Sequence, residues 1–214
     1  MFRDRTDAGR QLAKTLEGYR GEDVVVLAIP RGGVEVGYQV AKHLDAEFSI
    51  LVTRKLPFPD NPEAGFGAIA EDGSTFIHAD AAAYLSLPTR QRIIAAQKGE
   101  ILRRIRVLRG GGPLPEVAHR TVILVDDGIA MGSTMRASIR SCRNRQAGRI
   151  VVAVPVAGGR VAHEIDREVD DLVVLEQPAF FQAVAQVYQH WYDVPDREVL
   201  EIMETWRKER VESE

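Results

Sequence analysis

The chain contains a single cysteine, Cys142, so an internal disulfide framework and a zinc site built only from cysteines are both excluded. No apolar run approaches the roughly 18 residues that a membrane-spanning helix requires. The first 23 residues are rich in Arg, Asp and Glu and lack the apolar core of a signal peptide. We therefore expect a cytoplasmic protein with no membrane partner.

A strong charge of either sign is also lacking, because 28 Lys and Arg nearly balance 31 Asp and Glu. The net charge of −3 provides no general attraction to nucleic acid, which is not an expected partner. Basic side chains are concentrated in residues 88–120, and acidic ones in residues 193–214. A hydrophobic content of 45% is that of a globular protein able to bury a full core.

Several sequence signatures of nucleotide and hydrolase chemistry are missing. The chain has neither the Gly-x-Gly-x-x-Gly of dinucleotide-binding folds nor the Gly-Lys-Ser/Thr ending of a P-loop. Its five histidines show no metal-ligand spacing, and none stands beside Cys142. A mechanism based on a covalent nucleophile is therefore not indicated.

Apolar runs alternate with segments of helical periodicity along most of the chain, which predicts a doubly wound, mainly parallel α/β sheet. Strands are expected at residues 24–29, 48–53, 121–125, 150–154 and 172–175, and helices at 6–18, 34–44, 88–108, 133–146, 160–168 and 196–210.

Two segments do not fit into that sheet. Residues 56–66 are rich in Pro and Gly and are expected to form a loop, and residues 67–78 a small hairpin with its turn at 71–74. Residues 180–192 are rich in aromatics, which could stack on a flat base but are more typical of a core. We expect one domain, residues 1–214, with a core at about 20–178 and a cap made of 67–78 and 179–214.

The segment 122–135 carries the strongest chemical signal. Four apolar residues predict a buried strand, and Asp126 and Asp127 follow at its carboxyl end, where open α/β sheets bind ligands. A loop with Gly132, Ser133 and Thr134 then opens a helix, whose free N–H groups suit a phosphate. A carboxylate pair beside a phosphate site predicts a sugar phosphate, with hydroxyls or a hydrated Mg²⁺ at the carboxylates.

Basic and glycine residues follow the first two predicted strands. The turn Pro30-Arg31-Gly32-Gly33 ends the first strand, and Arg54-Lys55 ends the second at the same sheet edge. Taken alone, the first is an ordinary turn and the second an ordinary solvated pair. Beside the main motif, they predict a second anion site with charge-assisted hydrogen bonds.

The main motif closely resembles that of the type I phosphoribosyltransferase family, over roughly residues 20–178. The resemblance implies a parallel sheet flanked by helices, with a small cap (hood) subdomain. It also implies that Asp126 and Asp127 act at the ribose hydroxyls of phosphoribosyl pyrophosphate (PRPP) and hold Mg²⁺, directly or through water. The residues implied to bind PRPP are Arg31, Gly32, Gly33, Arg54, Lys55, Asp126, Asp127, Gly128, Ile129, Ala130, Met131, Gly132, Ser133 and Thr134.

Within this resemblance, the turn at residues 31–33 and the pair Arg54-Lys55 would meet the pyrophosphate. The basic segment ending in Arg109, followed by Gly110–Pro115, stands where we expect a flexible catalytic loop, and Arg109 is its candidate contact. The alternative is an ordinary helix end, with a basic last turn and a glycine stop.

The implied reaction moves the phosphoribosyl group from PRPP to a nitrogenous base or related small acceptor, with release of pyrophosphate. Hypoxanthine-type members carry a further Asp in the main loop, where this chain has Ala130, as adenine- and orotate-type members do. Hypoxanthine or guanine specificity is therefore disfavoured. The alternative is a regulator that keeps the site to sense PRPP without catalysis, and a homodimer is compatible with either.

Overall fold

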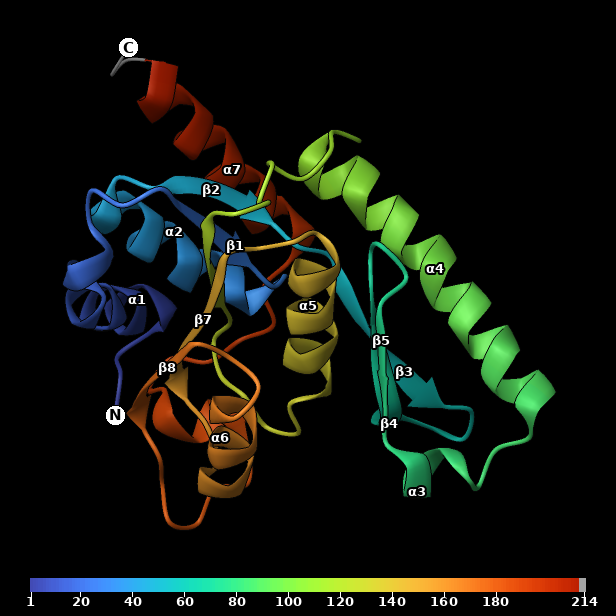
Figure 1. The fold of residues 1–214 in the computed structure, drawn as a ribbon. Helices are drawn as coiled ribbons and strands as arrows, with labels where there is room; N and C mark the ends of the chain where they lie inside the picture. Colours follow the sequence, from blue (N-terminus) through green and yellow to red (C-terminus); the bar gives the residue numbers. More distant parts are fainter. Residues whose placement is uncertain (212–214) are drawn as a thin grey trace.

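The computed structural model describes residues 1–211, whose centre is a five-stranded sheet. Every neighbouring pair of its strands is parallel, which confirms the predicted fold class (Figure 1). The strands, in spatial order, are β2 (Glu47–Ile50), β1 (Val24–Ala28), β6 (Thr121–Val125), β7 (Arg149–Val156) and β8 (Asp171–Glu176).

Alternate residues of the central strands face two separate apolar cores, as the two-residue period of a strand requires. Val26 and Ile123 are paired in register and face the core beneath α1 (Arg5–Thr15) and α2 (Gly32–Leu44). Their neighbours Val25 and Leu124 face the core beneath α5 (Ser133–Asn144) and α6 (Gly159–Asp166). Helices on both faces explain why these strands are apolar throughout.

A second, antiparallel sheet lies beside the first and consists of β3 (Thr53–Phe58), β4 (Asn61–Ala70) and β5 (Thr75–Ile77). The expected hairpin at 67–78 is present as β4 and β5, but residues 56–66, expected as a loop, lie largely in β3 and β4. The register shifts on both sides of Pro57 accommodate a residue that cannot join a regular ladder. The strand predicted at 48–53 correspondingly ends at Ile50, and Arg54 and Lys55 belong to β3.

The antiparallel sheet is docked on α5 and on the long helix α4 (Leu87–Arg109), and the short α3 (Ala79–Ala82) connects β5 to α4 (Figure 1). Thr53 Oγ1 lies 2.9 Å from Ser138 Oγ of α5 in a buried hydrogen bond. The small side chains of Ala68, Ala70 and Ala137 pack together and allow the sheet and the helix to approach closely. This docking fixes the sheet beside the N-terminus of α5.

The C-terminal segment packs along the core instead of joining the antiparallel sheet in one cap. Its helix α7 (Asp196–Val211) places Trp206 edge-on against Tyr38 and Phe48 of the α2 side, with ring centroids 6.1 and 5.5 Å away. The short turn η1 (Glu17–Tyr19) follows α1, and η2 (Val184–Val187) precedes α7. Tyr188, directly after η2, packs against Phe2 with the two ring planes tilted by 45°. Residues 212–214 of the predicted cap lie outside the described residues.

No helix among residues 1–211 combines the length and the apolar character needed to cross a membrane.

Candidate active site

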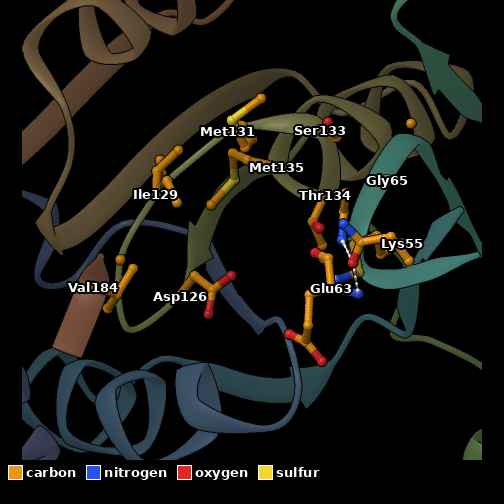
Figure 2. Close-up of a pocket in the computed structure, with 16 residues that line it drawn as sticks. Lys55, Glu63, Gly65, Asp126, Ile129, Met131, Ser133, Thr134, Met135 and Val184 are labelled. Atoms are coloured by element: carbon orange, nitrogen blue, oxygen red, sulfur yellow. Dashed lines mark hydrogen bonds between the residues drawn. The ribbon is translucent and has the colours of Figure 1, made fainter. Parts of the chain in front are cut away.

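A cavity of about 650 Å³ opens where β6 ends, between the N-terminus of α5 and the β3–β4 hairpin (Figure 2). Such a volume is in the range of small-molecule sites. It lies at the carboxyl edge of the parallel sheet, as the main motif predicts. Its lining residues are Lys55, Asn61, Glu63, Ala64, Gly65, Gly67, Asp126, Gly128, Ile129, Ala130, Met131, Gly132, Ser133, Thr134, Met135 and Val184.

The loop from Gly128 to Gly132 and the first two residues of α5, Ser133 and Thr134, form one wall of the cavity. The start of this loop is anchored because Ile129 N–H donates to Val156 O at the end of β7. Gly132 adopts a left-handed conformation with φ of +76° and caps the helix without a side-chain hydrogen bond. The first-turn N–H groups of α5 therefore remain available for an anion.

Asp126 and Asp127 have different surroundings although they are adjacent. Asp126 lines the cavity and, among the described residues, has no ion-pair partner; its Oδ1 accepts a hydrogen bond from the Asp127 backbone N–H. Asp127 is not among the lining residues, and its Oδ2 accepts a 2.8 Å hydrogen bond from Arg5 Nε. The structure thus brings one of the two predicted carboxylates into the cavity.

Arg5 is a site-supporting residue that sequence reasoning did not identify. Only 3% of its side chain is exposed, and its Nη1 donates to Tyr192 O at 3.0 Å. The Trp191 ring covers its guanidinium at 3.9 Å, while Tyr188 donates its hydroxyl hydrogen to the Asp127 carbonyl. The aromatic segment therefore encloses an ion pair, and its rings do not line the cavity.

The electrostatics of the acidic pair follow from this geometry. Burial, followed by the charge of Asp127, raises the pKa of Asp126 well above its ordinary value. Burial also raises the pKa of Asp127, but the Arg5 charge and hydrogen bond oppose that effect. Asp126 therefore has no ion-pair partner among the described residues and favours its protonated form, whereas Asp127 is paired with Arg5.

The β3–β4 hairpin brings the predicted residue Lys55 to the cavity, together with residues that were not predicted, among them Asn61 and Glu63. Lys55 points toward the cavity and donates to the Glu63 carbonyl, and the Glu63 carboxylate extends into the space beyond it (Figure 2). Asn61 lies at the start of β4, where its Oδ1 accepts from Glu63 N–H. Charged side chains inside a Pro- and Gly-rich segment were the only signal in the sequence.

Arg54 lies on the other face of β3 from Lys55, as strand alternation requires. Its Nε donates to Gln97 of α4, and burial, reinforced by the positive charge of Arg104, lowers its pKa. Arg31, which follows the cis Pro30–Arg31 peptide, is also near enough to repel Arg54. These arginines form a cationic cluster outside the cavity lining, defined here as Arg31, Arg54, Arg103 and Arg104.

Acidic residues of neighbouring helices partly neutralise this cationic cluster. Asp196, the first residue of α7, lies 3.6 Å from Arg31 and 3.7 Å from Arg103. Glu100 pairs with Arg103 and Arg104 on α4. Gly32 and Gly33, in the same turn as Arg31, approach the acidic pair so closely that a Cβ on Gly32 would lie 1.8 Å from Asp127 Oδ2.

Arg109 does not contact the cavity, contrary to its predicted place in a flexible catalytic loop. Its guanidinium makes two hydrogen bonds to Glu71, at 2.8 and 3.0 Å, and donates to Ile50 O and Gly112 O. Leu114, in the segment that follows, is buried in the core. The segment ends α4 as an ordinary basic last turn with a glycine stop, and the β3–β4 hairpin borders the cavity instead.

The side chains at the cavity suit a hydrated Mg²⁺ better than a metal ion that is coordinated only by protein side chains. Among residues 1–211, no group of three or more His, Cys, Asp or Glu side chains is arranged to hold a metal ion. Mg²⁺ commonly keeps several waters and binds through one or two carboxylates together with substrate phosphates. Asp126, unpaired and facing the cavity, is the carboxylate suited to that role.

Comparisons with known proteins agree with this geometry. The family description "Phosphoribosyl transferase domain" matches residues 5–189. A Mycobacterium tuberculosis protein named "Putative phosphoribosyl transferase" is 38% identical in each of two strains, H37Rv and CDC 1551, over an alignment covering 100% of this chain and 48% of the relative. The chain therefore spans about half the length of the curated relatives it matches.

Among solved structures, the crystal structure of TT1426 from Thermus thermophilus superposes with a TM-score of 0.80 at 35% identity. The match covers 96% of this chain and 99% of that one, so the two sheets and the C-terminal segment are included. Together, the family match over most of the chain and the site at the sheet edge show that this chain belongs to the phosphoribosyl transferase domain family.

Proposed function

We propose that the protein is a Mg²⁺-dependent phosphoribosyltransferase that moves the phosphoribosyl group of PRPP to a nitrogenous base. The observation that carries this proposal is the cavity itself, in which the N-terminus of α5, which has no side-chain cap, and Asp126, which has no ion-pair partner among the described residues, share one space. A phosphate at the helix N-terminus and ribose hydroxyls at Asp126 satisfy both features with one ligand. Membership of the phosphoribosyl transferase domain family also supports PRPP as the compound that gives up the phosphoribosyl group.

In this proposal, Ala130 to Thr134 surround the 5-phosphate and Asp126 accepts hydrogen bonds from the ribose hydroxyls. Lys55, which lines the cavity, neutralises the pyrophosphate. The pyrophosphate leaves as the C1–oxygen bond breaks and a nitrogen of the acceptor bonds to C1, and the proton of that nitrogen passes to the departing pyrophosphate. Mg²⁺ would supply additional positive charge at the pyrophosphate and ribose oxygens. Asp127, tied to Arg5, holds the loop in place and meets the ribose only if that ion pair opens.

Exclusion of water is a requirement of this chemistry, because water is a competing acceptor. The β3–β4 hairpin already borders the cavity through Asn61 and Glu63. The acceptor would enter between this hairpin and the wall formed by Ile129, Met131 and Val184, where apolar side chains suit a flat ring.

The test is a pyrophosphate-release assay with purified protein, PRPP and Mg²⁺ over a panel of purine and pyrimidine bases, repeated with EDTA. We expect release with at least one base and its loss with EDTA. PRPP binding without release for any base would instead establish a PRPP-sensing regulator. Absence of PRPP binding would reject the proposed site.

A further inference from the structure

His78, which follows β5, contacts the loop at the cavity wall. Its Nε2 lies 2.8 Å from the Oγ of Ser133, the first residue of α5 and one of the cavity-lining residues. The contact joins the antiparallel sheet to the N-terminus that opens the cavity. It has no counterpart in the sequence motifs, because His78 and Ser133 are 55 residues apart.

The orientation of the His78 ring is fixed by its neighbours. The ring packs edge-on against Phe76, with centroids 4.9 Å apart and planes at 87°. Phe76 is in turn covered by the guanidinium groups of Arg136 and Arg140. The His78 backbone N–H donates to Phe66 O within the same sheet. A ring held in this way can direct Nε2 at one hydroxyl.

A serine hydroxyl has one hydrogen to donate. When Ser133 donates it to a phosphate oxygen, Ser133 Oγ can only accept from His78, so Nε2 must carry a hydrogen. The opposite arrangement, in which Ser133 donates to Nε2, removes that hydroxyl as a phosphate donor. A neutral His78 donates only in the tautomer with its hydrogen on Nε2, whereas a protonated His78 always donates from Nε2. The tautomer and the protonation state of His78 therefore decide what Ser133 can offer a ligand.

We propose that His78 is a positioning residue that turns the Ser133 hydroxyl toward the phosphate of the bound sugar phosphate, so that phosphate binding and protonation of His78 Nε2 are coupled. The inference rests on the proposed function, since it concerns the 5-phosphate end of the same site. It adds His78, the residue directly after β5, to the groups that would act at the N-terminus of α5.

The charged groups around His78 determine whether phosphate binding raises or lowers the pKa of its ring. Burial and the nearby Arg136 lower the pKa of His78, with Arg160 adding to the effect and Glu164 opposing it. A phosphate dianion at Ser133 would oppose the arginines and raise that pKa. Binding should therefore take up a proton, and by linkage the affinity should rise as the pH falls toward that of His78 titration.

The first test measures ribose 5-phosphate binding by calorimetry at pH 7.5 for His78→Leu and His78→Gln. Loss of one hydrogen bond predicts an affinity about two- to tenfold weaker for His78→Leu. The glutamine amide can donate from nearly the same place as Nε2, so His78→Gln should recover most of the loss. His163→Gln, an exposed histidine on α6, is the matched control and should bind as the unchanged protein does.

A double-mutant cycle with Ser133→Ala separates positioning from a general structural role. In the Ser133→Ala background, His78→Leu should cause no further loss of affinity, because the hydroxyl it orients is gone. Melting temperatures of all variants report folding. If His78→Leu does not fold, the glutamine variant and the titration described next still decide the question.

The second test follows the His78 ring resonances by NMR from pH 5 to 8.5, with and without ribose 5-phosphate. We expect the His78 pKa to rise on binding. We also expect the affinity of the unchanged protein, relative to that of His78→Gln, to increase as the pH falls from 8 to 6.5. The titration of the phosphate itself, near pH 6, occurs with both proteins and cancels in that comparison.

Three results would overturn the inference while leaving the proposed function intact. They are binding by His78→Leu as tight as that of the unchanged protein, additive losses in the cycle, and a His78 pKa that binding does not move. Failure of the unchanged protein to bind either ribose 5-phosphate or PRPP would instead reject the proposed function, and the inference with it.

Discussion

Arg5 Nε lies 2.8 Å from Asp127 Oδ2, and this ion pair joins the first helix of the chain to the acidic pair after β6. Arg5 is buried beneath Trp191, so neither member exchanges freely with water. The protein itself therefore compensates the charge of Asp127, whereas Asp126 lines the cavity and has no ion-pair partner among the described residues. Two adjacent carboxylates of similar appearance in the sequence thus have different partners.

We predict that Arg5→Met lowers the free energy of unfolding by about 3–5 kcal/mol, because removal of one member leaves a buried charge uncompensated. Denaturant unfolding at pH 7 measures the change. Arg10→Met, on the exposed side of the same helix, is the matched control and should leave the melting temperature unchanged. Arg5→Met combined with Asp127→Asn should recover part of the loss. Equal effects of Arg5→Met and Arg10→Met would contradict a structural ion pair.

Asp126→Asn should stabilise the protein and weaken its binding of PRPP. The folded state holds the Asp126 proton to a higher pH than the unfolded chain does, so stability falls as the pH rises from the ordinary carboxyl pKa to the raised one. The asparagine removes this loss, and we expect a gain of about 0.5–2 kcal/mol at pH 7. Unfolding curves from pH 4 to 8 should show a flatter profile for the variant. A variant less stable than the parent at pH 7 would contradict this prediction.

Gly32→Ala should disrupt the site because there is no space for the added methyl group. The new Cβ would lie 1.8 Å from Asp127 Oδ2 and 2.8 Å from Arg5 Nε, so the ion pair must separate. We expect a loss of about 1–3 kcal/mol, as for other overpacked positions, together with weaker PRPP binding. Gly99→Ala, in the middle of α4 with nothing within 4 Å, should instead stabilise the protein by up to about 1 kcal/mol. Thermal unfolding and calorimetry would separate the two, and a harmless Gly32→Ala would show that the turn can move.

The variant Arg109→Lys tests whether Arg109 stabilises the fold or contacts the substrate. A lysine cannot reproduce the two hydrogen bonds to Glu71 together with those to the Ile50 and Gly112 carbonyls. We expect a loss of about 1–3 kcal/mol in unfolding free energy, and no effect from Arg106→Lys on the exposed face of α4. PRPP affinity, measured well below the melting temperature, distinguishes the alternatives. A tenfold loss of PRPP affinity in Arg109→Lys would instead indicate that Arg109 contacts the substrate.

Much of the fold could be predicted because it depends on neighbours along the chain. The apolar runs that form β1, β6 and β7 are buried on both faces, so their sequence pattern is continuous and unambiguous. By contrast, β3 and β4 contain Pro57, Pro62 and Gly65, which are typical of loops. Their pairing is set by the bulged register and by docking on α5, neither of which a local pattern contains.

The sequence by itself determined the α/β class, the position of the glycine- and hydroxyl-containing loop before α5 and the presence of two carboxylates at the end of β6. Only the tertiary structure decided which carboxylate faces the cavity, because Arg5 lies 122 residues from Asp127. It also decided that Arg109 meets Glu71 and that the β3–β4 hairpin borders the cavity. The spacing of apolar residues along a segment indicates which of its faces packs against the core. The choice of ion-pair partner depends on which distant segments that core brings together.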